Sequence, residues 1–233
     1  MTAKQTGKAA PGGRGRRLTP ARARDRILLI SLPRLFLYHR SLEDAHGEGV
    51  AMLTSLDLAG RVGRGISPAQ VRKDLSYVGN FGRRGQGYDV RLLVKKLAGV
   101  LGLDRDWRIA IVGFGFLGHA LASFLELREA KFRIAAIFDQ EPSIVGTRWG
   151  GQSIHHVVDM ENVLPQLGCG IGIITVPATA AQSVAELLAR CGVKALLNFA
   201  PTSLKLPAAV AVRSIDLAAE LSILTHNLAP KSR

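Results

Sequence analysis

A glycine-rich turn between two apolar segments constrains this chain more than any other feature. Residues 108–112 form a β-branched run that leads into G-x-G-x-x-G at Gly113, Gly115 and Gly118, and the next apolar run ends at Asp139. In this fingerprint the first glycine permits a tight turn, the second lets backbone approach a pyrophosphate, and the third lets the helix pack on the strand. The helix N-terminus favours phosphate, and an acid about 20 residues further on meets ribose hydroxyls. The pattern therefore predicts a dinucleotide site.

Apolar and helical segments continue to alternate after Asp139, which predicts an α/β fold with a doubly wound parallel sheet of the Rossmann type. Strands are expected over 170–176, 194–199 and 210–214. Ligands bind at the carboxyl ends of the strands in such sheets. The predicted cofactor contacts, besides the glycines and Asp139, are therefore Phe114, Phe116 and Leu117 in the fingerprint and Val176, Pro177 and Asn198 at strand ends.

The net charge of +13 is concentrated in the first part of the chain. Residues 1–100 hold 19 Lys/Arg and 7 Asp/Glu, whereas residues 101–233 hold 12 and 11. This asymmetry predicts a basic module joined to a nearly neutral one. Residues 1–30 are poor in apolar side chains and are expected to form a disordered basic tail. Because no signal-peptide core or long apolar stretch is present, we expect a cytoplasmic protein without a membrane partner.

The basic module has the pattern of a winged helix-turn-helix domain. A first helix is expected from Ser31, with Pro33 in its opening turn, to about Gly47, and a second over 55–62. Ser67 is the predicted N-cap of a third helix, and Gln70 is expected to complete its capping box. In that helix Val71, Leu75 and Val78 would form the buried stripe, which leaves Arg72, Lys73 and Ser76 on the outward side.

Residues 80–88 are predicted to form a β-hairpin wing after the third helix. Arg83 and Arg84 lie at its glycine-rich tip, where they would reach phosphates or a minor groove, and Tyr88 lies on its second strand. Arg72 and Lys73 alone would be interpreted as a solvated helix face. Because the wing and the charge asymmetry accompany them, DNA binding is the favoured interpretation.

A last helix is expected to begin at Asp216. Its leucines recur at 217, 221, 224 and 228 and form one continuous stripe. This stripe either closes the helix onto its own domain or docks on a partner subunit, and the residues alone leave both alternatives open. The predicted domains are a tail over 1–30, a winged-helix domain over 31–103, a Rossmann domain over 104–215 and a dimerisation helix over 216–233.

The nucleotide module shows no pattern typical of a catalytic centre. No Ser/His/Asp, Cys/His or paired-carboxylate arrangement lies near the predicted loops, and His155-His156 has no third ligand at metal-binding spacing. Cys169 and Cys191 are expected to be buried free thiols. A bound dinucleotide without adjacent chemistry favours sensing over catalysis. The alternatives are a nicotinamide-dependent oxidoreductase and a coenzyme A-binding module, each with a nucleic-acid-binding appendage.

Four segments together resemble the family of redox-sensing transcriptional repressors named Rex. They are residues 70–79, 81–90, 112–118 and 197–201, and the resemblance covers about residues 34–228. It implies a homodimer whose winged-helix domains bind palindromic double-stranded operator DNA and whose Rossmann domains bind NADH, with the last helix exchanged between subunits. It also implies that NADH releases the DNA and that NAD⁺ competes with NADH but drives release less well.

The resemblance further assigns roles to single residues. Arg72 and Lys73 would contact the operator, Arg83, Arg84 and Tyr88 would form the wing, and residues 113–118 with Asp139 would hold the dinucleotide. A switch cluster in the family combines an Arg of the first helix, a Tyr after the fingerprint and the Asp that opens the last helix. Arg40 and Asp216 match two of these positions, but Phe124 replaces the tyrosine, and Leu217 stands where an aromatic residue commonly covers the nicotinamide.

Overall fold

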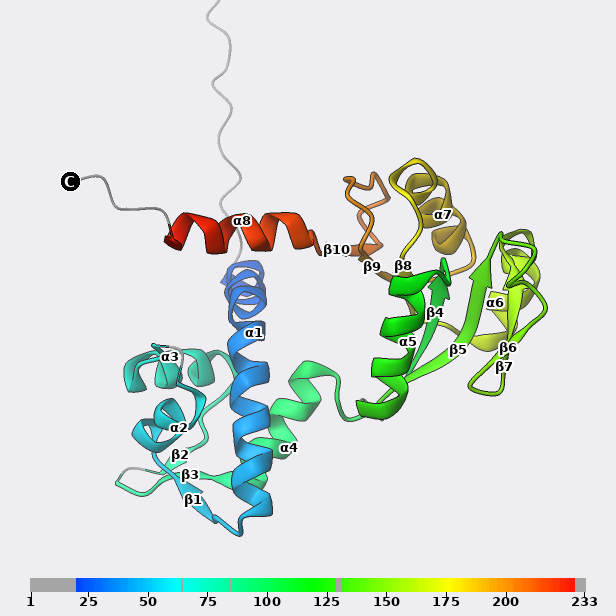
Figure 1. Cartoon of the computed structure of the whole chain (residues 1–233). Coiled ribbons are helices and arrows are strands. Elements are labelled where there is room, and N and C mark those ends of the chain that lie inside the picture. Colours follow the sequence, from blue (N-terminus) through cyan, green and yellow to red (C-terminus); the bar gives the residue numbers. More distant parts are fainter. Residues whose placement is uncertain (1–19, 64, 84, 129–130, 229–233) are drawn as a thin grey trace, which may run out of the picture. The chain divides into compact units, whose positions relative to one another are not determined.

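The computed structural model describes residues 20–63, 65–83, 85–128 and 131–228, and they form two compact units that divide between Asp104 and Arg105 (Figure 1). The division falls within the polar segment 104–106, which directly follows the predicted winged-helix domain. Most of the predicted basic tail, residues 1–19, lies outside the described residues. Residues 20–30, which we expected to be disordered, are helical instead.

The first unit is a three-helix core with a small antiparallel sheet, followed by a fourth helix. The sheet has the order β1-β3-β2, and β2 pairs with β3 as a hairpin in which Gly82 lies opposite Tyr88. This arrangement confirms the winged helix-turn-helix fold. The elements are α1 (Pro20–Gly47), β1 (Met52–Leu53), α2 (Ser55–Val62), α3 (Pro68–Val78), β2 (Gly82–Arg83), β3 (Gly87–Asp89) and α4 (Val90–Leu101).

Helix α1 begins earlier than predicted, and Ser31 is not its N-cap. Pro33 lies inside the helix, where it removes one backbone hydrogen bond without ending the helix. Ser31 is buried instead, and its hydroxyl donates to Asp74 of α3. The helix continues through Pro33 where Leu35 and Tyr38, both fully buried, anchor it by tertiary packing.

The caps of the other helices follow the sequence with one exception. Ser67 caps α3 by accepting from the Gln70 N–H, as predicted, and Asp89 caps α4 by accepting from the Leu92 N–H. The Gln70 side chain does not reach back to complete a capping box, because it donates to Asp74 one turn further along. A complete capping box is formed instead by Thr54 and Asp57 at α2.

The second unit is a seven-stranded sheet in the order β10-β9-β8-β4-β5-β7-β6, in which only β6 pairs antiparallel. The first strand is central and the order reverses between β4 and β8, which confirms the doubly wound Rossmann topology. The elements are β4 (Trp107–Val112), α5 (Phe116–Arg128), β5 (Phe132–Asp139), β6 (Arg148–Trp149), β7 (Gln152–His156), η1 (Val157–Asp159), α6 (Met160–Leu167), β8 (Ile171–Ile174), α7 (Ala178–Arg190), β9 (Ala195–Asn198), β10 (Ala211–Ser214) and α8 (Leu217–Leu228).

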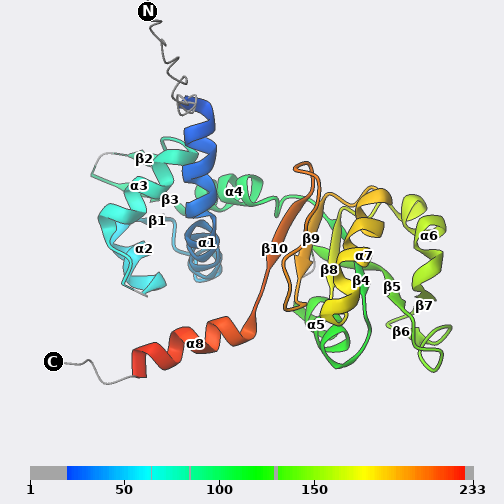
Figure 2. The same ribbon diagram turned by 90° about the horizontal axis from the view of Figure 1, so that it is seen from above.

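Helices cover both faces of this sheet, as the two views show (Figures 1 and 2). Ala110 and Val112 of β4 pack with α6 and α7 on one face, whereas Ile109 and Ile111 pack with α5 on the other. This alternation follows from the period of two in a strand. Within the described ranges, no helix combines the length and apolar character that crossing a bilayer requires.

Candidate nucleotide pocket and nucleic-acid interface

The three fingerprint glycines have different surroundings at the turn between β4 and α5. Gly113 has φ +92°, and a Cβ there would lie 2.9 Å from the Thr175 backbone, so this position requires glycine. A Cβ on Gly118 would overlap the carbonyl oxygen of Gly113. A Cβ on Gly115 would meet no atom within 4 Å. Because the fold itself does not need Gly115, its place in the fingerprint is explained by a ligand that approaches the backbone there.

Asp139 ends β5 and joins this strand to the glycine turn. One carboxylate oxygen accepts the Phe114 N–H, and the other accepts the N–H groups of Gln140 and Glu141 at 2.7 and 2.9 Å. These bonds fix the carboxylate at the strand end with little exposure. A carboxylate has about four lone-pair sites, so one site stays open, on the oxygen that accepts only the Phe114 N–H. The prediction that an acid stands beside the fingerprint is thus matched by the geometry.

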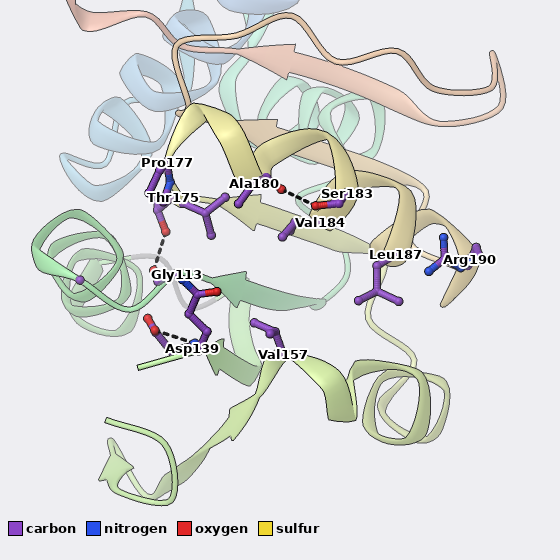
Figure 3. Close-up of a pocket in the computed structure, with 13 residues that line it drawn as sticks. Gly113, Asp139, Val157, Thr175, Pro177, Ala180, Ser183, Val184, Leu187 and Arg190 are labelled. Carbon is purple, nitrogen blue, oxygen red and sulfur yellow. Dashed lines mark hydrogen bonds between the residues drawn. The ribbon is translucent and has the colours of Figure 1, made fainter. Parts of the chain in front are cut away.

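A pocket of about 470 Å³ opens at the carboxyl ends of β4, β5 and β8 (Figure 3). Its volume lies in the range of small-molecule sites. Asp139 lies on one side of it and Thr175 and Pro177 on the other, while Arg190 stands at the far end of α7. Of the predicted contacts it contains Gly113, Gly115, Asp139, Val176 and Pro177. Its walls along α7 are mainly apolar, with Ala180, Val184 and Leu187.

Thr175 is a site residue that the sequence analysis missed. Its hydroxyl donates to the carbonyl oxygens of Gly113 at 2.6 Å and Val112 at 3.0 Å, so it ties the glycine turn to the end of β8. A polar residue directly after a buried strand, next to two predicted contacts, was the signal that could have identified it. Thr175 therefore belongs to the framework that shapes the pocket.

Asn198 is not among the residues that line the pocket, and its contact with a cofactor stays a prediction. Its amide donates to the carbonyls of Ala200 and Thr202, and its oxygen accepts the Ala200 N–H. The side chain is fully buried in these bonds. Its role in the single chain is to close the loop after β9, because a buried amide must satisfy its donors and acceptor locally.

The apolar residues of the fingerprint face different environments. Phe114 is buried, with its ring 5.7 Å from that of Trp149, whereas Phe116 is fully exposed and Leu117 partly so. Phe114, Phe116 and His119 line a second hollow of about 510 Å³ beside the turn. The lining of the main pocket does not include Phe114, Phe116, Leu117 or Gly118. Their contact with a cofactor stays a prediction.

The groups that line the main pocket show no acid–base pair. Asp139 is the single carboxylate among them, and three backbone N–H groups occupy it. Arg190 pairs with Glu161 at 3.2 Å. Burial raises the pKa of the Cys169 thiol to about 11, so this thiol is not a nucleophile at neutral pH. Among the described residues, no group of three or more His, Cys, Asp or Glu is arranged to hold a metal ion.

The outward face of α3 carries the predicted DNA-contacting residues. Arg72, Lys73 and Ser76 are exposed, whereas Val71 and Leu75 are buried in the core. One Arg72 guanidinium nitrogen donates to the Ser55 hydroxyl of α2 at 2.8 Å, which orients this side chain across the helix-turn-helix. The face is thus basic and solvent-accessible, as a recognition helix requires.

Tyr88 lies on β3 of the wing, as predicted, but most of it is buried. The residue is 9% exposed and belongs to the core of the first unit, and burial raises its pKa. The Tyr88 side chain therefore packs against the core beneath the hairpin, and its contact with DNA stays a prediction. Arg83 lies on β2, but its side chain and all of Arg84 lie outside the described residues.

Asp74 of α3 was not predicted to matter, yet its buried carboxylate has four hydrogen-bond partners among the described side chains. It is 0% exposed, and its carboxylate accepts from Ser31, Arg34, Tyr38 and Gln70 over distances of 2.6 to 3.0 Å. Burial raises the pKa of this carboxyl, but the hydrogen bonds outweigh burial and hold it below its ordinary value. Asp74 is therefore ionised at neutral pH.

The four predicted switch residues are distributed over both units. Arg40 is exposed on α1, and Phe124 is half-exposed on α5. Asp216 caps α8 by accepting the N–H groups of Ala218 and Ala219, and Leu217 opens that helix with an exposed side chain. All described side chains of α8 are exposed, including Leu221 at 62%. In the structure, α8 therefore does not bury its leucine stripe against its own domain, which was one of the two alternatives.

Comparison with known proteins identifies relatives over most of the chain. Proteins named redox-sensing transcriptional repressor Rex are 41% identical in Desulforamulus reducens and 44% identical in Desulfitobacterium hafniense, over 87% and 84% of this chain and 96% and 92% of theirs. Residues 104–202 match the family model "CoA binding domain", and residues 30–76 match "Putative DNA-binding protein N-terminus".

Solved structures of a Rex-family repressor share the fold of this chain. RSP, a Rex-family repressor, in complex with β-NAD⁺ and operator DNA superposes with a TM-score of 0.80 at 32% identity, over 87% of this chain and 91% of that one. RSP in complex with β-NADH superposes with a TM-score of 0.74 at 30% identity, over 87% and 93%.

Proposed function

This chain belongs to the Rex family of redox-sensing transcriptional repressors, and from that premise we propose that it binds palindromic operator DNA as a homodimer and releases it when NADH binds. The observation that carries the proposal is the combination of two sites in one chain. A recognition helix with a basic exposed face lies in the first unit, and a nucleotide pocket without an acid–base pair lies in the second. Relatives named as transcriptional repressors favour this over the oxidoreductase alternative.

The pocket fits the adenosine and pyrophosphate parts of NADH. The open space at Gly115 leaves room for phosphates beside the N-terminus of α5, whose unpaired N–H groups favour negative charge. Asp139 would accept a hydroxyl of the adenosine ribose with its remaining lone pair. A phosphate on the ribose, as in NADPH or coenzyme A, would replace one donor by an anion and repel this carboxylate. Val176 and Pro177 would contact the bound nucleotide from the β8 side.

On the DNA side we assign Arg72, Lys73 and Ser76 to the major groove and Arg83 and Arg84 of the wing to phosphates or the minor groove. The exposed basic face of α3 supports the first assignment. The burial of Tyr88 limits it to a supporting role in the wing. Operator contacts of this kind make the affinity depend steeply on salt.

The two sites communicate through the dimer in this proposal. NADH and DNA favour different global arrangements of the same protein, so each must weaken the binding of the other by the same factor. The exposed leucines of α8 support a contact with a partner subunit, with this helix exchanged between the two chains. Arg40 and Asp216 would form the state-dependent pair. Phe124 cannot donate a hydrogen bond to this pair, and Leu217 would cover the nicotinamide in place of an aromatic ring.

We assign operator binding to residues 31–103, NAD(H) binding to residues 104–215 and dimer contacts to residues 216–233. We propose the cytoplasm as the location, because the protein needs access to both DNA and the NADH pool.

A competition experiment tests the ligand assignment. The fraction of radiolabelled NADH that stays bound to the purified chain is measured by equilibrium dialysis while NAD⁺, NADPH or coenzyme A is added at equal concentration. We expect NAD⁺ to displace NADH and the two ribose-phosphorylated ligands to fail. An Asp139→Asn variant, which lacks the negative charge, should reduce the difference between its affinity for NADH and its affinity for NADPH. Displacement by coenzyme A as effective as that by NAD⁺ would contradict the assignment and favour a coenzyme A ligand.

A further inference from the structure

We propose that Asp74 is a positioning residue for operator recognition, which sets the orientation of α3 against α1 through its buried hydrogen-bond network. This inference rests on the proposed operator binding and extends it to a residue that does not contact DNA. Asp74 follows the predicted DNA-contacting residues Arg72 and Lys73 directly in the chain, but its side chain points to the opposite, buried side of α3.

The network joins two helices that are far apart in the sequence. Ser31, Arg34 and Tyr38 lie at positions i, i+3 and i+7 of α1, and this spacing places them on one helix face. Arg34 contacts both carboxylate oxygens, with its Nε 2.6 Å from Oδ2 and its Nη2 2.8 Å from Oδ1. A two-bond pair of this kind fixes the angle between its partners as well as their distance.

The other donors complete the network around both oxygens. The Tyr38 hydroxyl donates to Oδ2 at 2.9 Å, and Ser31 and Gln70 donate to Oδ1 at 3.0 and 2.8 Å. Hydrogen bonding to Asp74 is the main cause that raises the pKa of Arg34. All lone-pair sites of the carboxylate are therefore used, and rotation or sliding of α3 would break several bonds at once.

Stability alone does not explain this arrangement. Replacing a buried ion pair by apolar side chains of similar volume is often neutral or stabilising, because desolvation offsets much of the attraction. Val71 and Leu75 already anchor α3 in the hydrophobic core on either side of Asp74. Apolar contacts tolerate small shifts, whereas the network permits one geometry. The network therefore fixes the direction in which the Arg72 and Lys73 side chains project from α3.

The test compares specific with non-specific DNA binding in Asp74→Asn and in a matched control. The wild-type chain first selects a duplex from a randomised pool, and affinities for this duplex and a scrambled one are measured by fluorescence anisotropy at one salt concentration. The asparagine amide would place donors against the donors of Arg34 and Tyr38. Asp44→Asn, exposed on α1 and outside the network, changes the net charge equally.

We expect Asp74→Asn to lose about tenfold or more in affinity for the selected duplex and less than about threefold for the scrambled one, since non-specific binding depends on phosphate contacts. Asp44→Asn should change both by less than about threefold. An unchanged ratio of the two affinities in Asp74→Asn would overturn the proposal while operator binding itself stands. A wild-type chain that selects no duplex would instead overturn the proposed function, and this inference with it.

If Asp74→Asn does not fold, Arg34→Lys replaces it, because the Arg34 side chain is partly exposed and lysine keeps the charge. Lysine cannot make the two-bond pair. The ratio of the affinity for the selected duplex to the affinity for the scrambled duplex should then fall by about threefold or more. A ratio equal to that of the wild-type chain would reject the positioning role.

Discussion

At the scale of single residues, two glycines of one fingerprint carry different constraints. Gly118 is required by the fold, because the carbonyl oxygen of Gly113 occupies the place of its Cβ. Gly115 faces open space, so the fold does not require it, and the fingerprint assigns it to the approach of a ligand. The sequence motif predicted both positions, but it could not separate the structural glycine from the binding glycine. The separation depends on how the turn folds back on itself.

This difference gives a matched pair of variants. Gly115→Ala should keep the wild-type melting temperature and lose about tenfold or more in NADH affinity, or about 1.4 kcal/mol, because its methyl group occupies the pyrophosphate position. Gly118→Ala should lower the melting temperature by roughly 4 °C or more. Both quantities are measured by thermal unfolding and NADH titration. Normal NADH binding by Gly115→Ala would refute the placement of the phosphates.

Asp74 also makes the first unit sensitive to acid. Its pKa is lower in the folded chain than its ordinary value of 3.8, because its hydrogen bonds outweigh the burial that opposes ionisation. A group with a lowered pKa stabilises the fold above its unfolded pKa, and this stabilisation is lost as the pH falls through the folded pKa. The wild-type chain should therefore lose stability below about pH 4.

Denaturant unfolding of wild type and Asp74→Asn tests this expectation. The gap in unfolding free energy between them should be large at about pH 7 and smaller at about pH 3, where the wild-type carboxylate gains a proton. An equal gap at both pH values would mean that the ionised carboxylate is not the stabilising form.

At the scale of elements, helix caps and apolar runs were predictable from the sequence, whereas contacts between distant residues were not. The starts of α3 and α4 follow from Ser67 and Asp89, and the core of the Rossmann unit follows from its apolar runs. The burial of Asp74 was missed, because its partners on α1 lie 36 to 43 residues away in the sequence. In sequence Asp74 looks like part of a charged surface. Likewise, the hydrogen bonds that Asn198 makes within its own loop were not predicted.

Helix α8 gives a prediction at this scale. Leu221→Glu should abolish or weaken dimer formation without lowering the stability of the single chain, because this side chain is 62% exposed there. Ala219→Glu adds the same charge on the opposite side of the helix and should leave the dimer intact. Light scattering after gel filtration measures the mass of each variant. A dimer that survives Leu221→Glu unchanged would exclude the leucine stripe of α8 from the subunit contact.

At the scale of the whole molecule, the two units supply two sites, and the function requires that they affect each other. The pocket and the recognition helix are each explained by residues of their own unit. The sequence predicted both units and their order. It could not predict how strongly they are coupled, because coupling is a difference between two global arrangements of a dimer. Phe124 and Leu217 are the residues through which this chain would differ from other family members in that respect.

The most direct measurement is the release of operator by the two redox forms of the nucleotide. A labelled palindromic duplex bound by the full chain is followed by fluorescence anisotropy at fixed salt, while NADH or NAD⁺ is added. We expect NADH to weaken DNA binding by about tenfold or more, within the usual range of allosteric coupling, and NAD⁺ at equal concentration to have a smaller effect. Tight DNA binding that neither nucleotide changes would contradict redox sensing by this protein.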